Sequence, residues 1–475
     1  MTPKRGTKRK ANENPTTSAT NANGDTAVAT IDREHWPGWV EIESDPLLFT
    51  TLLKDMGVRG IAVHDMESGL DDISLVTLPK PIHAFIFLFR YAEVAKTDQV
   101  PTSCPKDVWF ANQVPEFACA TFALLNIVNN IPDLELGREL QKLKDFTQGM
   151  DPLSRGDAVD SFDFVRRIHN SFAREKDMLE ADLAIKNKAD KYKKRKAAEK
   201  ASKTKAAKKA AQASGNAAIK ASLEDAQPDG EAPTKGVRRS ARPPKPRKTP
   251  YSAVTDDSEE AGFHFVAYMP INGHVWMLDG MDRFPTDVGS YTDVKNGGDW
   301  LRVAMPALQA RMAATDDIRA TLLAVTHDDL YSSRRDLIAN TKAIKRTEQK
   351  LADIMDCWRE MDGAETPKDA ISGPAPALGI KQEDIDAADF DVDVKMRIEK
   401  ADGDMLKLIK LRNELLSAQP ILRGSVRDLY AKEKSMDEQA AKRKHDYGKF
   451  VRGWVGALAG EGVLRGLAES AEDDG

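Results

Sequence analysis

The chain has 475 residues, 31% of them charged, and a formal net charge of only −5. This length exceeds that of an ordinary single domain, so we expect one main domain with extensions. Three cysteines are too few for a disulfide framework, and they form no C-x-x-C pair for zinc. No stretch approaches the roughly 18 apolar residues of a membrane span, and the N-terminus lacks an apolar signal-peptide core. We therefore expect a protein that is neither secreted nor membrane-spanning, in a reducing intracellular compartment.

The first 34 residues predict a disordered, basic tail. They are rich in Thr, Asn, Ala, Lys and Gly and cannot bury enough apolar surface to fold. Residues 4–10 (KRGTKRK) form a basic cluster of the nuclear-import type. The alternative is a solvated tail without a function of its own.

A globular pattern begins near Trp39. Asp45 followed by Pro46 predicts the start of a helix with an acidic cap, and Gly57 predicts its end. Residues 81–89 form a continuous apolar run bounded by Pro81 and Arg90. Such a run is typical of a buried central strand.

Three residues predict nucleophilic chemistry. Cys119 follows the small Ala118 and precedes an apolar run, which places it at the N-terminus of a buried helix where a thiolate is stabilised. His264 lies in an alternating strand pattern, and an Asn-Gly turn at 272–273 would set it beside Asp279 on the neighbouring strand. Taken alone, each is more simply a buried structural residue. Together, in the order Cys, His, Asp, they are the parts of a thiol hydrolase.

With Gln113 six residues before Cys119 and His264 fifteen before Asp279, the chain resembles the ubiquitin C-terminal hydrolase (UCH) family of cysteine proteases. Residues 38–46 resemble the opening strand of that family, and residues 166–174 resemble the segment before its active-site crossover loop. The resemblance implies Cys119 as nucleophile, His264 as general acid and base, Asp279 as the group that orients His264, and Gln113 as the oxyanion-hole donor. It implies no cofactor and no metal.

The family resemblance also implies an α+β, papain-like UCH fold, in which a central antiparallel sheet is flanked by helices and the chain path is knotted. We assign residues 35–312 to this catalytic domain. Leu322, Leu323 and Val325 open a pattern that predicts a helical or coiled-coil segment over 313–362. Residues 363–391, rich in Pro, predict a linker, and residues 392–475 predict a helix to about 418 and a tail domain.

Residues 175–259 depart from the family, because they form a long basic insert at the position of the crossover loop. Between 186 and 248 there are 20 Lys or Arg against 6 Asp or Glu. We expect a solvated helix up to 211 and disorder beyond, so that the insert is largely disordered. About 85 flexible residues would span roughly 50 Å, enough for a folded conjugate to pass beneath. The basic tract could direct nuclear import, bind nucleic acid or a nucleosome, or serve only as a spacer.

The last residues resemble the C-terminal tail of the long branch of the family. Residues 442–451 (KRKHDYGKFV) precede a short amphipathic helix that contains several glycines. In that branch the tail docks on a helical adaptor, either a proteasomal ubiquitin receptor or a chromatin adaptor. The alternative is an ordinary C-terminal helix. The glycines weaken intrinsic helicity, so we expect the tail to order on a partner.

The resulting prediction is a deubiquitinating cysteine protease that cleaves the (iso)peptide or small-adduct bond at the C-terminal glycine of ubiquitin. It would act in the nucleus and cytoplasm, in a proteasomal or a chromatin setting, with ubiquitin conjugates and a helical adaptor as partners. The alternatives are a non-catalytic ubiquitin-binding scaffold and a chromatin- or DNA-binding protein that acts through its basic insert.

Overall fold

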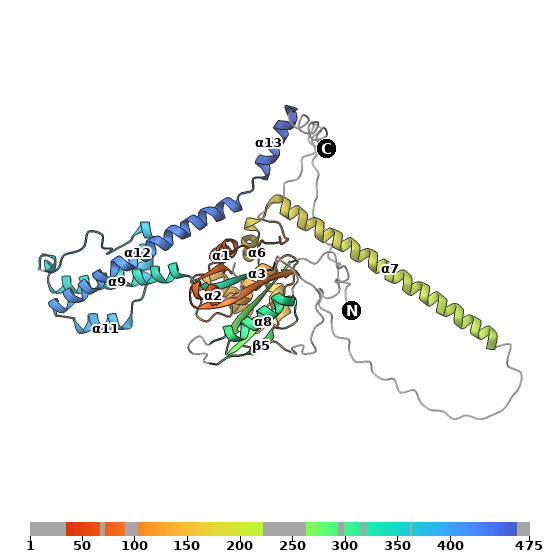
Figure 1. Ribbon diagram of the computed structural model, residues 1–475, viewed down its shortest axis with the longest axis horizontal. Coiled ribbons are helices and arrows are strands. Elements are labelled where there is room, and N and C mark those ends of the chain that lie inside the picture. Colours follow the sequence, from red (N-terminus) through yellow and green to blue (C-terminus); the bar gives the residue numbers. More distant parts are fainter. Residues whose placement is uncertain are drawn as a thin grey trace, which may run out of the picture. The chain divides into compact units, whose positions relative to one another are not determined.

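The computed structural model describes residues 35–66, 72–90, 103–221, 263–292, 299–314, 320–361 and 363–462, without the side chains of residues 72–74, 199 and 201–221 (Figure 1). The chain divides into two units, Met1–Pro37 and Gly38–Gly475. Every helix and strand named below lies in the second unit. The tail predicted over 1–34 lies outside the described residues.

A six-stranded sheet forms the centre of the described catalytic region. Its strand order is β1-β6-β2-β3-β4-β5, and each neighbouring pair is antiparallel. The strands are β1 (Ile61–Asp65), β2 (Ile82–Arg90), β3 (Phe263–Ile271), β4 (His274–Leu278), β5 (Thr286–Ser290) and β6 (Thr321–His327). The antiparallel central sheet expected from the sequence is therefore present, whereas the knotted chain path stays a prediction.

Both faces of the sheet are buried, as the side chains of β2 show. Ala84, Ile86 and Leu88 join a hydrophobic cluster that includes residues of helices α1, α3 and α4. Phe85, Phe87 and Phe89 join a second cluster that includes residues of α8. Because alternate side chains enter two different cores, the strand reads as a continuous apolar run. The prediction of a buried central strand over 81–89 is confirmed.

The helices of the catalytic region are short. They are α1 (Pro46–Asp55), α2 (Asp72–Thr77), α3 (Cys119–Val128), α4 (Gly137–Phe146), α5 (Pro152–Asp160), α6 (Asp163–His169) and α8 (Leu301–Ala314). The predicted cap of α1 is confirmed, since the Leu47 N–H donates to Asp45 Oδ1 over 2.7 Å. The predicted end is confirmed as well, because Gly57 follows with φ +98°. Residues 38–45, expected to open with a strand, form no regular strand.

The sequence interpretation of residues 321–327 is wrong. They form strand β6 between β1 and β2, not the start of a helix, so the sheet extends past residue 312. Leu323 and Val325 enter the first hydrophobic cluster, while Leu322 and Ala324 enter the second. A strand buried on both faces loses the period-two pattern that would distinguish it from a helix.

Beyond the sheet the chain is helical. Helix α9 (Asp329–Ile354) packs along α12 (Met405–Lys444), and α11 (Val392–Lys400) and α13 (Gly448–Gly460) complete this region (Figure 1). The helix predicted from 392 to about 418 is interrupted by a turn at 401–404. The part of the predicted 313–362 helix that falls on α9 is confirmed, while the coiled-coil description stays a prediction.

Residues 363–391 are not the free linker that their prolines predict. They contain α10 (Gln382–Ala387), and Leu378, Ile380 and Ile385 are buried in a cluster with residues of α9 and α12. These apolar side chains contact the helix pair and hold the segment in place. The segment is therefore part of the folded helical extension.

The first part of the basic insert is one long helix, α7 (Glu175–Ala221). It continues about ten residues past the end expected at 211, so disorder is the wrong description of residues 212–221. The rest of the insert, 222–259, lies outside the described residues. Within the described part of the chain, no helix combines the length and the apolar character needed to cross a membrane.

Candidate active site

Cys119 is the first residue of α3, as its sequence context predicts. Ala118 precedes it and offers no side-chain cap, so the N–H groups of the first turn have no capping acceptor. Phe117 has φ +64°, a rare conformation for a bulky residue and a sign of local strain. All ten residues of α3 are buried, which fixes the position of the thiol at the end of a helix dipole.

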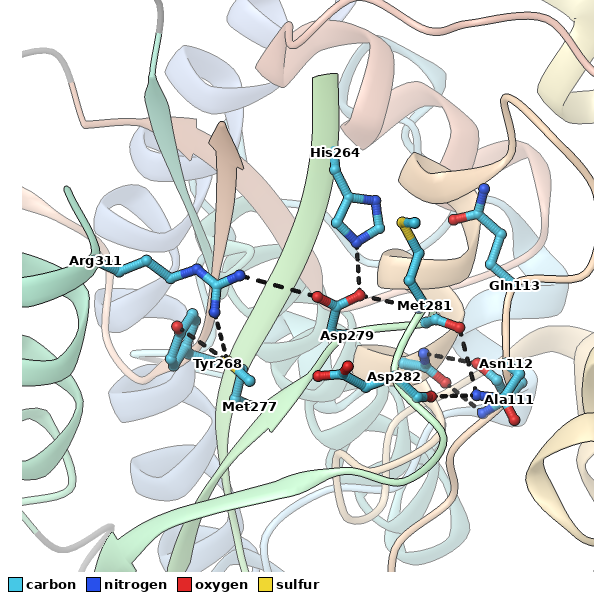
Figure 2. A network of polar contacts seen from close by, with 12 residues as sticks. Ala111, Asn112, Gln113, His264, Tyr268, Met277, Asp279, Met281, Asp282 and Arg311 are labelled. Carbon is cyan, nitrogen blue, oxygen red and sulfur yellow. Dashed lines mark hydrogen bonds and ion pairs between the residues drawn. The ribbon is translucent and has the colours of Figure 1, made fainter. Parts of the chain in front are cut away.

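His264 and Asp279 are brought together by the hairpin of β3 and β4. Asn272 and Gly273 both have positive φ (49° and 85°), as a type I′ hairpin turn requires. His264 Nε2 lies 2.6 Å from Asp279 Oδ1, and both side chains are buried (Figure 2). One detail differs from the prediction, because Asp279 directly follows the last residue of β4 instead of lying on the strand.

The electrostatics of this buried pair favour two opposite charges. Burial by itself lowers the pKa of His264, but the charge and hydrogen bond of Asp279, with those of Cys119, raise it to about 10. Burial raises the pKa of Asp279, but His264, the Met281 N–H and Arg311 together bring it below the usual value. We therefore expect an imidazolium beside a carboxylate at neutral pH.

The Cys119 thiol acts on the same imidazole, because its charge and hydrogen bonding are among the causes that raise the pKa of His264. Because Nε2 of His264 is engaged by Asp279, Nδ1 is the ring nitrogen that remains for the sulfur. The structure thus pairs His264 with Asp279, and Cys119, up to 160 positions away in the chain, contributes to the raised pKa of His264. Chemically, this arrangement can exchange a proton between sulfur and imidazole.

Gln113 lies on the loop that leads to α3, and its main chain is tied to the Asp279 loop. The Gln113 N–H donates to the Gly280 carbonyl over 2.9 Å, and its side-chain Nε2 donates to the Pro115 carbonyl over 3.0 Å. The neighbouring Asn112 adds a 2.6 Å bond from Nδ2 to the Asp282 carbonyl (Figure 2). The amide of Gln113 has a second N–H available for a ligand.

Two glycines permit this close approach of loops. A Cβ on Gly156 would lie 2.1 Å from the Asn112 carbonyl oxygen, and a Cβ on Gly280 would lie 3.1 Å from Gln113 Cβ. The first distance is impossible for any side chain, so the position requires glycine for the observed packing. These glycines carry no local turn signal that sequence reasoning could have used.

His169 has a structural role. Its Nδ1 lies 2.7 Å from Thr121 Oγ1 on α3, and its Nε2 lies 2.8 Å from the Val40 carbonyl. Burial lowers its pKa to about 4, so the ring is neutral and can donate to the carbonyl while accepting from the hydroxyl. This bridge helps to hold α3, and therefore Cys119, against the opening segment.

Helix α7 of the basic insert contacts the loop that precedes the thiol. Lys188 Nζ lies 2.7 Å from Glu116 Oε1, and Glu116 is three residues before Cys119. Over its described part, the insert therefore forms a helix that contacts this loop. The described residues of the insert form helix α7, and not the flexible arch of about 85 residues that the sequence predicts.

Two functional contacts were not predicted from the sequence. The Met281 N–H donates to Asp279 Oδ1 over 2.9 Å, and Arg311 Nη2 of α8 lies 4.0 Å from Asp279 Oδ2. Neither residue lies in a motif that marks it. Among the described residues, no group of three or more His, Cys, Asp or Glu side chains is suited to hold a metal ion.

The chain is similar to a known protein family and to several of its members. Residues 39–313 match the model of the family described as ubiquitin carboxyl-terminal hydrolase, family 1. "Ubiquitin carboxyl-terminal hydrolase calypso" of Aedes aegypti is 28% identical over 327 residues, covering 66% of this chain and 52% of the relative. "Ubiquitin carboxyl-terminal hydrolase ubh-4" of Caenorhabditis elegans is 25% identical over 437 residues, covering 91% of each chain. The chain thus spans about half of the mosquito relative and most of the nematode one.

A solved structure of Trichinella spiralis UCH37 bound to ubiquitin vinyl methyl ester is also similar. Its sequence identity is 25% and its TM-score is 0.38, with 63% of this chain and 86% of that chain covered.

Proposed function

This chain belongs to family 1 of the ubiquitin carboxyl-terminal hydrolases, and on that premise we propose that it is a deubiquitinating cysteine protease. It hydrolyses the (iso)peptide or small-adduct bond at the C-terminal glycine of ubiquitin. One observation supports this reaction most directly. His264 is buried and paired with Asp279, and the thiol of Cys119, at the start of a helix, is one of the groups that raise the pKa of His264.

Acylation starts from the ion pair in which the Cys119 thiol has already given its proton to His264, because the imidazolium is the form expected at neutral pH. The thiolate attacks the carbonyl carbon of the terminal glycine, and a tetrahedral oxyanion forms. The free N–H of the Gln113 amide and the Cys119 N–H donate to this oxyanion; one such donor typically lowers a barrier by about 2.7 to 4 kcal/mol. His264 then protonates the leaving amine, the C–N bond breaks, and a thioester remains on Cys119.

Deacylation uses the same groups in reverse. His264 removes a proton from water, the hydroxide attacks the thioester carbonyl, and the C–S bond breaks to release the carboxylate of ubiquitin. Asp279 keeps the imidazole in one orientation through both steps. The reaction is hydrolysis without net oxidation or reduction: His264 gives its proton to the leaving amine, and the attacking water supplies the proton that returns to His264.

The direct test is the Cys119→Ala variant of the full chain. Wild type should release fluorophore from a ubiquitin C-terminal amide and become labelled at Cys119 by a ubiquitin electrophile, and the variant should do neither while retaining ubiquitin binding. Turnover by Cys119→Ala would exclude this mechanism. Wild type that binds ubiquitin without labelling or turnover would favour a scaffold.

For the C-terminal tail we propose docking on a helical adaptor, such as a proteasomal ubiquitin receptor or a chromatin adaptor. Helix α13 is amphipathic, yet Phe450 and Trp454 are 70% and 58% exposed. Exposed aromatic side chains on one short helix are typical of an interaction surface. A Phe450→Ser/Trp454→Ser variant should lose a partner that co-purifies with the wild-type chain while hydrolysing ubiquitin amides at the same rate.

We further propose that the basic tract 186–248 binds nucleic acid or a nucleosome and that the protein acts in nucleus and cytoplasm. In the described part of α7, Lys193, Lys194 and Arg195 are exposed. Clustered exposed cations bind phosphates in a salt-dependent way. Deletion of 186–248 should abolish DNA binding and nuclear accumulation of a tagged chain. Unchanged DNA affinity at low salt would limit the tract to a spacer.

A further inference from the structure

Asp279 has two cationic neighbours, one at each carboxylate oxygen. His264 Nε2 and the Met281 N–H bind Oδ1, at 2.6 and 2.9 Å. Arg311 Nη2, from the last turn of α8, lies 4.0 Å from Oδ2. Figure 2 shows the dashed lines from Arg311 and His264 ending on different oxygens of Asp279. Sequence reasoning assigned Arg311 no role, and the reaction steps above do not use it.

Arg311 also contacts the aromatic ring that packs against the imidazole of His264. Its guanidinium carbon lies 4.5 Å from the centroid of the Phe89 ring, a cation–π distance. The Phe89 ring in turn meets the His264 ring edge to face, with centroids 6.0 Å apart and an interplanar angle of 81°. The Arg311 guanidinium therefore contacts Asp279 directly and His264 through the Phe89 ring.

The guanidinium itself is held in place by the sheet. Its Nη1 donates to Met277 Sδ over 3.0 Å, and Tyr268 donates its hydroxyl to the same sulfur over 3.2 Å. Met277 lies on β4 and Tyr268 on β3, the two strands that carry the catalytic hairpin. Because α8 and the hairpin are locked together at this point, the position of the cation is defined relative to Asp279.

We propose that Arg311 is a positioning residue for the hydrolysis: its charge keeps the second oxygen of Asp279 ionised and fixed, so that the first oxygen stays aligned with His264. A buried carboxylate with a partner on one side only is costly and free to rotate or take up a proton. A rotated or neutral Asp279 would release the imidazole from the orientation that faces Cys119. The alternative is that Arg311 merely packs α8 against the sheet. The proposal rests on the hydrolase function proposed above.

The test compares Arg311→Met and Arg311→Lys in the full chain. Methionine keeps an unbranched stem against Phe89 but removes the charge, whereas lysine keeps the charge. Arg302→Met is the matched control, because Arg302 lies on the same helix, is largely exposed and pairs with Asp299. The measurements are kcat and KM on a ubiquitin C-terminal fluorogenic amide at pH 7.5. The dissociation constant of ubiquitin is measured in the same variants combined with Cys119→Ala.

Arg311→Met should lower kcat by about tenfold or more, as misorientation of a catalytic group does. KM and the ubiquitin dissociation constant should stay within about twofold, Arg311→Lys should recover most of kcat, and Arg302→Met should equal wild type. Wild-type kcat in Arg311→Met would overturn the proposal, and so would a loss in Arg311→Lys as large as in Arg311→Met. If Arg311→Met does not fold, the neutral Arg311→Gln replaces it. Inactive wild type would instead overturn the hydrolase function.

Discussion

Asp279→Asn removes one charge from a buried pair while leaving its shape unchanged, and it should move the alkaline limit of activity. In the folded chain the pKa of His264 is raised from 6.5 to about 10, against burial, chiefly by the charge of Asp279. A rise of this size corresponds to about 5 kcal/mol in favour of the imidazolium. Without the carboxylate, burial acts almost alone on the ring and lowers the pKa of His264.

The expected result follows from the sign of these shifts. The imidazolium of the wild type persists as the pH rises and is lost only near pH 10, so kcat/KM should decline there. In Asp279→Asn the alkaline decline of kcat/KM should begin about one pH unit lower or more, and the plateau value of kcat/KM should fall about 10²-fold. Because the folded pKa of His264 is raised, the pair also adds stability that is complete below pH 6.5 and lost as pH rises through about 10.

The assay is kcat/KM on a ubiquitin C-terminal amide from pH 6 to 10.5, roughly the range in which this group titrates. Asp287→Asn is the matched control, because Asp287 also pairs with a histidine, His274, but at the surface. That variant should show the wild-type profile. If Asp279→Asn declines at the same alkaline pH as wild type, Asp279 does not hold the charge of His264 and the electrostatic reasoning fails.

Three further substitutions test the packing beside the site, the oxyanion-hole donor and a buried ion pair of the helical extension. Gly156→Ala sets a Cβ 2.1 Å from the Asn112 carbonyl oxygen. The free energy of unfolding in urea should therefore fall by about 1 to 3 kcal/mol, and kcat should fall as well. Gly373→Ala is the control, because Gly373 has open space around it and neither quantity should change. Gln113→Ala should lower kcat by about 10² to 10³ with unchanged ubiquitin affinity, and an unchanged kcat would remove it from the oxyanion hole. Arg412→Met removes a fully buried guanidinium that donates to Glu348 and to the Ala364 carbonyl. Glu348 keeps Arg359 as a partner, so the unfolding free energy of the helical extension should fall by about 1 to 3 kcal/mol, mainly for the buried carbonyl left without its donor; no loss would mean that water replaces the guanidinium.

Features set by a few neighbouring residues were predictable. Asp45 caps α1 because its carboxylate reaches an N–H two residues on, and the Asn272-Gly273 turn forms because both residues tolerate positive φ. Cys119 was placed at a helix start by the small residue before it and the apolar run after it. The family spacing of Gln113, Cys119, His264 and Asp279 predicted the rest of the candidate site. The structure adds the contacts between them.

Other features depend on segments far apart in the chain. Residues 321–327 are a strand only because β1 and β2, more than 230 positions earlier, flank them on both sides. Leu378 is buried because its Pro-rich segment packs against helices α9 and α12. The long helix α7 and its contact from Lys188 to Glu116 follow no motif either.

The sequence by itself therefore determined the caps, the hairpin turn and the buried runs, and its resemblance to the family predicted the reactive side chains. Those properties arise from backbone preferences and side-chain chemistry within a few residues. Only the tertiary structure decided that Arg311 faces Asp279 and that β6 completes the sheet. Contacts of this kind form when distant segments share a core, and the burial that stabilises them leaves no signal at either position alone.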